Sequence, residues 1–307
     1  MRHRPRYLKQ PWLWLAVVIF AASCAPDHQD VTGPGTPPAS SAVATPSAAA
    51  TAVGVCDFNP TETALTGPGW GKVFEDSFSG DLSQWTPWTG GAFNEELQFY
   101  QPANLETTNG LLSITARKET VTGPSTPYDA TPKTFSYTSG RIESKNYFSA
   151  SNATPKVRLS ARLKLPTGYG MWPAFWSYGD PWPTQGEIDV MEARGQEPFQ
   201  YQTAYWFGRR PGKNLVSNSA TVIWSNVTLM DCWHVYEVIW TKSALTFLFD
   251  GQVVDTKSGG YIPSMYGKQE RITLNLAVGG LFFGSYDPNA IQPGTFQVDW
   301  VKAFTSR

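Results

Sequence analysis

The sequence has few charged residues and few histidines, and both shortages exclude classes of protein. Only 16% of its 307 residues are charged, below the ~25% of an average domain. Lys and Arg number 24 against 25 Asp and Glu, so the basic footprint of a nucleic-acid binder is missing. Three histidines are present, and only His234 lies in the part expected to fold. A zinc site built from several histidines is therefore excluded.

Long apolar runs and helical patterns are also missing. The longest apolar run, residues 11–22, is shorter than the ~20 residues that a membrane-spanning helix needs. No Gly-x-Ser-x-Gly motif occurs, and His234 alone could act as a base, so a serine hydrolase is disfavoured. Aromatic residues, by contrast, make up 14% of the chain, with 13 Trp beside 27 Gly and 24 Pro. This composition favours an all-β fold with an aromatic-lined site.

The N-terminus has the pattern of an export signal. Residues 1–10 hold basic side chains and no acid, residues 11–22 are apolar, and Ser23 and Cys24 follow. The sequence before Cys24 resembles a bacterial lipoprotein signal, in which this cysteine becomes the lipidated first residue. We expect an exported protein whose membrane contact is an anchor at Cys24 on the cell envelope. The alternative is an ordinary signal peptide and a secreted protein.

The remaining chain divides into a tether and one domain. Residues 24–55 are rich in Pro, Ala, Ser and Thr, and such a segment buries too little apolar surface to fold. Residues 56–307 predict one β domain, expected to be a monomer. Cys56 and Cys232 are its only cysteines. An exported protein favours a disulfide between them, with two buried thiols as the alternative.

Alternating apolar and polar residues predict β-strands in this domain. In Lys156–Leu165 the apolar residues share one face and Arg158, Ser160 and Arg162 share the other, as in a half-buried strand. Asp250-Gly251 lies between two apolar runs and predicts a hairpin. The natural interpretation is an antiparallel sandwich. Further expected strands are Leu112–Ala116, His234–Trp240, Leu245–Phe249, Val253–Thr256 and Phe296–Trp300.

Three acids follow one another in Gly186–Ala193 (GEIDVMEA). Glu187 and Asp189 share a face of a regular strand, whereas Glu192 points the other way. A β-bulge near Val190–Met191 would bring Glu192 to the same face. Because clustered carboxylates raise one another's pKa, the cluster suggests paired acid and nucleophile chemistry. A solvated acidic edge or a calcium site are the alternatives.

GEIDVMEARG resembles the signature of glycoside hydrolase family 16, the laminarinase-type β-glucanases, in the bulged E-x-D-x-x-E branch. Further matches occur in the same order along residues 70–304. They are Asn94–Gln98, Leu111–Lys118, Tyr137–Lys145, Ala161–Pro166, Gly170–Trp176, Leu274–Gly280 and Val298–Val301.

The resemblance implies a β-jelly roll (concanavalin-like) of two curved antiparallel sheets with an open substrate cleft. It also implies a retaining double displacement, with Glu187 as the nucleophile, Glu192 as the general acid/base and Asp189 between them tuning their pKa values. No cofactor is required. Asp299 resembles a ligand of a structural calcium, although Ser77 stands where many relatives have Glu beside that site.

The same resemblance implies substrate contacts. Asn94 and Arg141 resemble polar contacts on the glycone side, and Trp172 and Trp182 resemble aromatic residues of the cleft. Trp206 stands where many laminarinases carry His and is assigned to the substrate site. Phe282 replaces a frequent Trp. For Trp176 we expect core packing rather than a place in the cleft.

The most consistent function is cleavage of internal β-glycosidic bonds of a polysaccharide, and β-1,3-glucan is the substrate that the resemblance favours most. A transglycosylase, or a hydrolase for mixed-linkage glucan or β-galactan, is the alternative. Trp206 and Phe282 differ from the residues that many relatives carry at these positions. These differences leave the catalytic acids unchanged but affect which substrate we expect the cleft to accept. A non-catalytic sugar-binding jelly roll is the third possibility, against which the costly acidic cluster argues.

Overall fold

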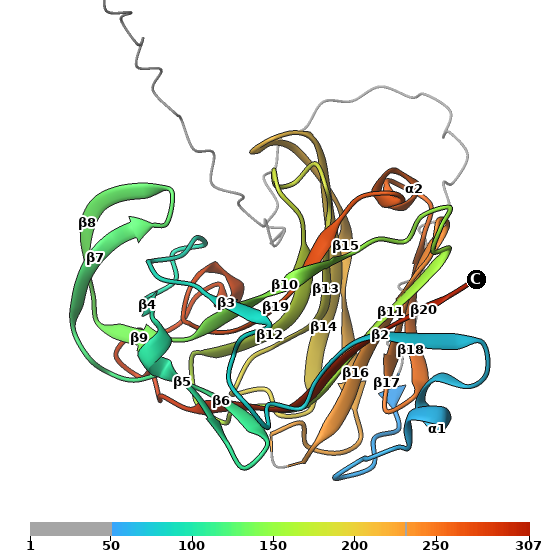
Figure 1. Ribbon diagram of the computed structural model, residues 1–307. Coiled ribbons are helices and arrows are strands. Elements are labelled where there is room, and N and C mark those ends of the chain that lie inside the picture. Colours follow the sequence, from blue (N-terminus) through green and yellow to red (C-terminus); the bar gives the residue numbers. More distant parts are fainter. Residues whose placement is uncertain (1–50, 231) are drawn as a thin grey trace, which may run out of the picture. The chain divides into compact units, whose positions relative to one another are not determined.

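The computed structural model describes residues 51–230 and 232–307 (Figure 1). The signal peptide expected for residues 1–23, Cys24 and most of the expected tether lie outside the described residues. The described chain begins with β1 (Thr51–Ala52), which pairs with β15, so pairing starts a few residues before the expected domain boundary. No helix in the described part is long and apolar enough to cross a membrane.

Two large sheets form the molecule, which confirms the predicted all-β jelly-roll sandwich. Sheet A has the strand order β1-β15-β14-β13-β12-β19-β10-β3. All its pairings are antiparallel except that of β1 with β15. Its other strands are β3 (Trp85–Pro87), β10 (Arg141–Phe148), β12 (Met171–Tyr178), β13 (Glu187–Ala193), β14 (Gln200–Arg210), β15 (Lys213–Ser225) and β19 (Glu270–Val278).

Sheet B is antiparallel, with the order β18-β17-β16-β11-β20-β6-β5 and with β2 paired to β20. The strands expected from alternation all occur here, including the hairpin at Asp250-Gly251, where both residues have positive φ. The strands are β2 (Trp70–Asp76), β5 (Leu105–Thr108), β6 (Leu111–Thr115), β11 (Lys156–Lys164), β16 (His234–Trp240), β17 (Ala244–Phe249), β18 (Gln252–Ser258) and β20 (Thr295–Ser306).

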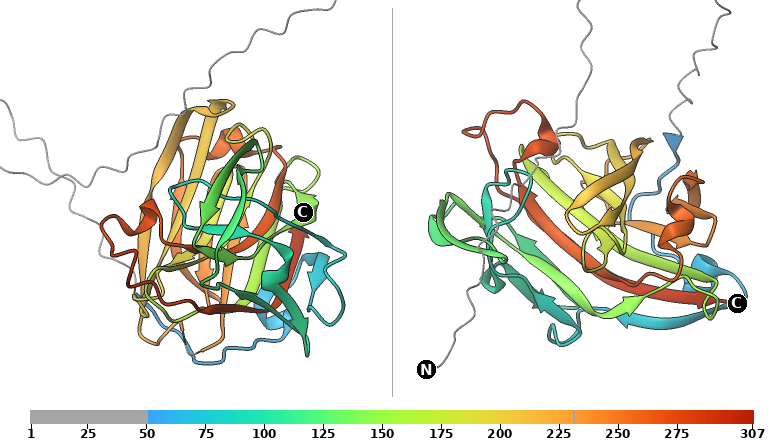
Figure 2. Two further views of the ribbon diagram at one scale, coloured as in Figure 1. Left: turned by 90° about the vertical axis from the view of Figure 1, so that its left-hand side faces the viewer. Right: turned by 90° about the horizontal axis from the view of Figure 1, so that it is seen from above.

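Two small strand pairs lie outside the large sheets. β4 (Gln98–Tyr100) pairs with β9 (Tyr137–Ser139), and β7 (Val121–Thr126) forms a hairpin with β8 (Asp129–Phe135). Figure 2 shows this hairpin at one end of the domain, away from the short helix α2. The helical turns are α1 (Glu62–Thr66), α2 (Ile262–Met265), η1 (Pro102–Asn104) and η2 (Leu281–Phe283).

The main core lies between the inner faces of the two sheets. Strand β11 contributes Val157, Leu159, Ala161 and Leu163 to it, as the alternation predicts. The opposite face of β11 was expected to be exposed, and this expectation is wrong beyond Lys156. Arg158 is buried and pairs with Glu237 at 2.7 Å. A second apolar cluster of Leu65, Val235, Trp300 and Phe304 also lies outside the main core.

The N-terminal strap, residues 53–67, explains this burial in part. Its Phe58 carbonyl accepts a hydrogen bond from Arg162 Nε at 2.7 Å, and Leu65 joins the outer cluster. Cys56 forms a disulfide with Cys232, which decides between the two alternatives left by the sequence. His234 is fully buried, with Nδ1 at 2.8 Å from Asp250 and Nε2 at 3.1 Å from the Thr228 carbonyl. It is therefore a structural histidine.

Candidate active site

Strand β13 carries the three acids near the middle of sheet A. Cα pairing with β12 passes from Trp176–Asp189 directly to Phe175–Met191, so Val190 is the extra residue of a β-bulge. The pairing of β13 with β14 shifts at the same place. Ile188, Val190 and Met191 are buried in the main core. The bulge predicted from the spacing is confirmed, and it presents Glu187, Asp189 and Glu192 on the opposite side, called here the acidic face.

Each acid receives a hydrogen bond from a different indole. Trp182 Nε1 donates to Glu187 Oε2 at 2.6 Å. Trp206 Nε1 donates to Asp189 Oδ2 at 3.0 Å, and Trp172 Nε1 donates to Glu192 Oε1 at 3.0 Å. The three tryptophans assigned to substrate contact are thus the immediate partners of the carboxylates. Trp206 meets Asp189 in the position where the resemblance expects His.

The Trp172 ring is itself held by η2. Phe282 stacks on it with ring centroids 4.5 Å apart and an interplanar angle of 13°. The guanidinium carbon of Arg194 lies 3.9 Å from the centroid of the Phe282 ring, and Arg194 Nη2 donates to the Phe282 carbonyl at 2.6 Å. The replacement of a frequent Trp by Phe282 therefore preserves an aromatic support behind the donor to Glu192.

Burial raises the pKa of all three acids, and repulsion by neighbouring acids adds to this for Glu187 and Glu192. Desolvation is the largest cause for Glu187 and for Glu192, and the charge of Asp189 adds to it in both cases. Desolvation also raises the pKa of Asp189 to about 7, against the opposing effects of the Trp206 hydrogen bond and the Lys257 charge. The cluster therefore favours a proton on one of its members near neutral pH, as a general acid requires.

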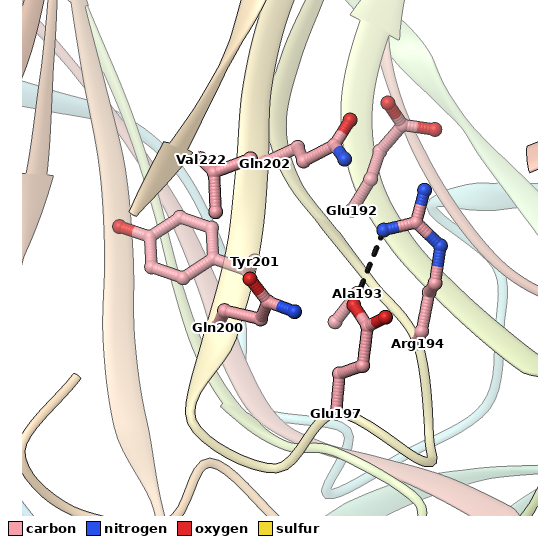
Figure 3. A pocket seen from close by; sticks show the side chains of 8 residues that line it. All are labelled: Glu192, Ala193, Arg194, Glu197, Gln200, Tyr201, Gln202 and Val222. Carbon is pink, nitrogen blue, oxygen red and sulfur yellow. Dashed lines mark hydrogen bonds and ion pairs between the residues drawn. The ribbon is translucent and has the colours of Figure 1, made fainter. Parts of the chain in front are cut away.

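Glu192 borders a small pocket between β13, β14 and β15 (Figure 3). Its Cα partner on β14 is Gln202, whose amide extends beside it in Figure 3. Arg194 and Glu197 form an ion pair of 3.2 Å at the pocket's edge. A polar amide therefore lies beside the acid/base candidate on the β14 side. Lining residues are Glu192, Ala193, Arg194, Glu197, Gln200, Tyr201, Gln202 and Val222.

Toward β3 the acidic face continues as a polar network. Trp176 pairs across the strands with Asp189 and is half-buried outside the main core, so its expected place in the core is wrong. Its Nε1 donates to Asn275 Oδ1 at 2.7 Å, and Asn275 Nδ2 donates to Tyr100 Oη at 3.1 Å. Tyr100 in turn donates to Glu96 Oε2 at 3.2 Å, and burial raises the pKa of Glu96 to about 7.

Arg141 lies farther along the same face. Its ion pair with Glu143, at 2.7 Å, is buried. The guanidinium lies 4.0 Å over the Trp88 ring and 4.8 Å over the Trp176 ring. Arg271 adds a second cation on Glu143 at 3.1 Å. Arg141 is therefore held between two indoles of the face.

Asn94 and Asp299 lie in different surroundings. Asn94 is exposed with φ of 56°, and its carbonyl accepts from the Leu281 N–H at 2.8 Å. Asp299 forms an ion pair with Arg162 at 2.7 Å. A guanidinium on this carboxylate repels a divalent cation, and the described residues contain no group of three or more His, Cys, Asp or Glu suited to a metal. These residues do not fit the expected calcium site. Substrate contact by Asn94 stays a prediction.

Comparison with known proteins gives a consistent result. Residues 94–302 match the model of Glycosyl hydrolases family 16. Glucan endo-1,3-beta-glucosidase A1 of Niallia circulans is 32% identical, over 80% of this chain and 39% of that protein. A glucan endo-1,3-beta-glucosidase of Cryptopygus antarcticus is also 32% identical, over 77% of this chain and 92% of its own length.

A solved structure supports the same assignment. The endo-beta-1,3-glucanase of Pyrococcus furiosus superposes with a TM-score of 0.65 at 30% identity, covering 78% of this chain and 95% of that one. The chain spans about two fifths of the length of the Niallia relative and nearly all of the other two. The family match covers the acidic strand and the strands around it. The chain belongs to glycosyl hydrolases family 16.

Proposed function

We propose that the protein cleaves internal β-1,3 bonds of a glucan by a retaining double displacement. One observation carries the proposal: a bulged strand presents Glu187, Asp189 and Glu192 on one face, and a separate indole N–H holds each carboxylate. A sugar-binding module has no need of such a cluster, in which the charge of Asp189 raises the pKa of both glutamates.

The two outer acids divide the chemistry. Glu187 attacks the anomeric carbon, while the protonated Glu192 gives its proton to the leaving glycosidic oxygen. Glu192, now ionised, then removes a proton from water, whose oxygen attacks the same carbon and releases Glu187. Asp189 lies between them, and its charge acts on both pKa values. The indole donors hold both carboxylates in place before substrate binds.

β-1,3-Glucan is the first substrate because the named relatives from Niallia, Cryptopygus and Pyrococcus are all endo-1,3-glucanases or glucosidases. A keratan-sulfate endo-1,4-beta-galactosidase of Sphingobacterium multivorum is 29% identical over 55% of this chain. A β-galactan is therefore a competing substrate. A mixed-linkage glucan is another, since an endo-1,3-1,4-beta-glycanase of Rhizobium meliloti is 30% identical over 72% of this chain. Trp206 lies beside Asp189 at the position where the family resemblance expects a His, so a polar group is lost there. This loss makes transfer of the glycosyl group to a sugar acceptor a competing reaction.

The experiment compares the parent with Glu187→Gln on laminarin, mixed-linkage glucan and a β-galactan, with the products separated by chromatography. Glutamine keeps the shape but cannot act as the nucleophile, so we expect short oligosaccharides from the parent alone. Glu106→Gln, a change at an exposed acid on β5 in the other sheet, is the matched control and should behave as the parent. When an oligosaccharide of one of these polymers is the substrate, products longer than that oligosaccharide would show transfer. Cleavage by Glu187→Gln at the parent's rate would overturn the proposal.

We further propose that the protein is exported and anchored at Cys24. The basic and apolar N-terminal pattern supports export, and the Cys56–Cys232 disulfide suits an oxidising compartment. The full chain should incorporate labelled palmitate in a bacterial host and partition with membranes. A Cys24→Ser variant that keeps the label would contradict the anchor.

A further inference from the structure

An aromatic cluster with two exposed rings and one half-buried ring lies at the β3 edge of sheet A. It consists of Trp88, which directly follows β3, Phe93 in the β3–β4 loop, and Tyr128 at the tip of the β7–β8 hairpin. Tyr128 is 67% exposed and Phe93 38% exposed. Their rings stack with centroids 6.5 Å apart and an interplanar angle of 23°, and Tyr128 meets Trp88 edge-on at 6.2 Å.

We propose that this aromatic platform, Trp88, Phe93 and Tyr128, binds a distal part of the polysaccharide chain whose bond is cleaved at Glu187 and Glu192. The inference rests on the proposed function, because it extends the same substrate beyond the acidic strand. The flat apolar faces of pyranose rings suit exposed aromatic rings, which supply area at a small cost in side-chain entropy.

The platform is continuous with the acidic face. Trp176 lies beside Asp189 in the cross-strand pairing, and Arg141 lies over Trp176 at 4.8 Å and over Trp88 at 4.0 Å. Trp88 then contacts Tyr128. Four strand spacings separate β13 from β3, or ~19 Å. A sugar repeat is about as long as one spacing, so only a substrate of several sugars can touch both the acids and Tyr128.

The hairpin that carries Tyr128 is fixed to the edge of the sheet. The Gly91 N–H donates to the Pro124 carbonyl at 3.0 Å, and Phe135 packs against Phe99 with centroids 5.4 Å apart. A Cβ on Gly91 would lie 2.1 Å from the Ser125 carbonyl oxygen. The position of the platform is therefore built into the fold, and the exposed Tyr128 ring has no role in the core.

The charge around the platform suits a neutral ligand. The nearby ionic groups neutralise one another, since Glu143 pairs with Arg141 and Arg271, and Arg271 also pairs with Asp180. Tyr128 lies close enough to Asp180 and Glu143 that their charges, after burial, raise the pKa of its hydroxyl. Aromatic faces beside balanced charges favour an uncharged polyol over an anionic partner.

The test measures binding by calorimetry in the Glu187→Gln protein, which should bind substrate without cleaving it. The probes are β-1,3-gluco-oligosaccharides from two to seven units. Tyr128→Ala should weaken binding of the six- and seven-unit probes by ~3–10-fold and leave two- and three-unit probes unchanged. Tyr128→Phe, which keeps the ring, should bind as the parent at every length.

Gly91→Ala gives an independent disturbance of the same platform, because the added methyl must displace the hairpin. It should reproduce the length-dependent loss while the melting temperature reports whether the domain is intact. Equal binding of long probes by Tyr128→Ala and the parent, or an equal loss at all lengths, would overturn the platform. If the Glu187→Gln parent binds no probe of any length, the proposed β-1,3-glucan substrate fails, and the platform fails with it.

Discussion

At the scale of single residues, the acids are held by indole donors. An N–H that points at a carboxylate favours its ionised form and so lowers its pKa. Trp182 opposes the effect of burial on Glu187, and Trp172 opposes it on Glu192. Tryptophan thus acts on proton affinity here, besides any contact it makes with sugar.

This arrangement predicts two separate changes in the pH profile of kcat/KM. Trp182→Phe removes the donor to Glu187, raises its pKa and should move the acidic limb to higher pH. Trp172→Phe should raise the pKa of Glu192 and move the alkaline limb to higher pH. A hydrogen bond to a charged group is worth ~1.5–3 kcal/mol, so each limb should move by ~1–2 pH units.

The two variants control for each other, because each loses one indole and each should leave the other limb in place. The profile is measured with one soluble oligosaccharide at concentrations well below KM. Limbs that stay at the parent's pH in both variants would show that the indoles do not set these pKa values.

The sequence could identify the acids but not most of their partners. Glu187, Asp189 and Glu192 lie within six residues, so a strand with one bulge is enough to bring them together. Asn275, Tyr100 and Glu96 join the face from strands and loops far away in the chain. Such contacts depend on which strands become neighbours, which alternation alone does not determine. Trp176 was misplaced because an apolar segment does not reveal which face of its strand is covered.

At the scale of elements, a β-bulge in β13 lets three acids of uneven spacing share one face. Val190 is the extra residue that returns Glu192 to the acidic face, while Ile188, Val190 and Met191 remain in the core. A regular strand of the same sequence, without the bulge, would turn Glu192 toward the core, because side chains alternate along a strand. The bulge therefore couples the packing of the core to the chemistry on the other side of the sheet.

Deletion of Val190 should preserve cleavage, because Glu187, Asp189 and Glu192 would then alternate with Ile188 and Met191 along a regular strand and still share one face. It should lower the melting temperature, since a buried apolar side chain is lost from the core. Met191→Leu, which keeps both the residue count and the approximate volume, is the matched control and should stay active at nearly the parent's melting temperature. A folded deletion variant that no longer cleaves would refute this account of the bulge.

The same elements explain an error of the sequence-based prediction for sheet B. The polar face of β11 alternates as a solvent-facing strand would, yet Arg158 and Arg162 are buried. Arg162 meets the Phe58 carbonyl of the strap, and Arg158 meets Glu237 on β16. Buried charges persist where they are paired. A polar strand face can therefore be an internal ionic layer, and alternation does not distinguish the two cases.

At the scale of the whole molecule, the Cys56–Cys232 disulfide closes most of the domain into a loop, because its two cysteines are separated by 176 positions in the sequence. Loops of this length restrict the unfolded chain strongly. A Cys56→Ser, Cys232→Ser double variant should lose ~3–5 kcal/mol of unfolding free energy. The melting temperature should fall by ~2–4 °C for each kcal/mol.

Cleavage at 25 °C should survive in the double variant, because the acids lie on the other sheet from β16. Urea unfolding of both proteins, followed by Trp fluorescence and by residual activity, measures the difference. An unchanged unfolding midpoint would show that the strap and the ionic layer beneath it hold the N-terminal segment without the covalent bond.

The disulfide also determines where a mechanical load on the N-terminus enters the domain. Once the two-residue pairing of β1 with β15 has opened, tension applied upstream of Cys56 passes through the sulfur atoms to Cys232 and thus to the start of β16, which β17 and β11 flank on both sides. The strap from Asp57 onward therefore does not carry this tension and stays packed on the sheet. Strand β13 belongs to the opposite sheet and stands outside this load path, so a chain pulled from its N-terminus keeps its acids in register.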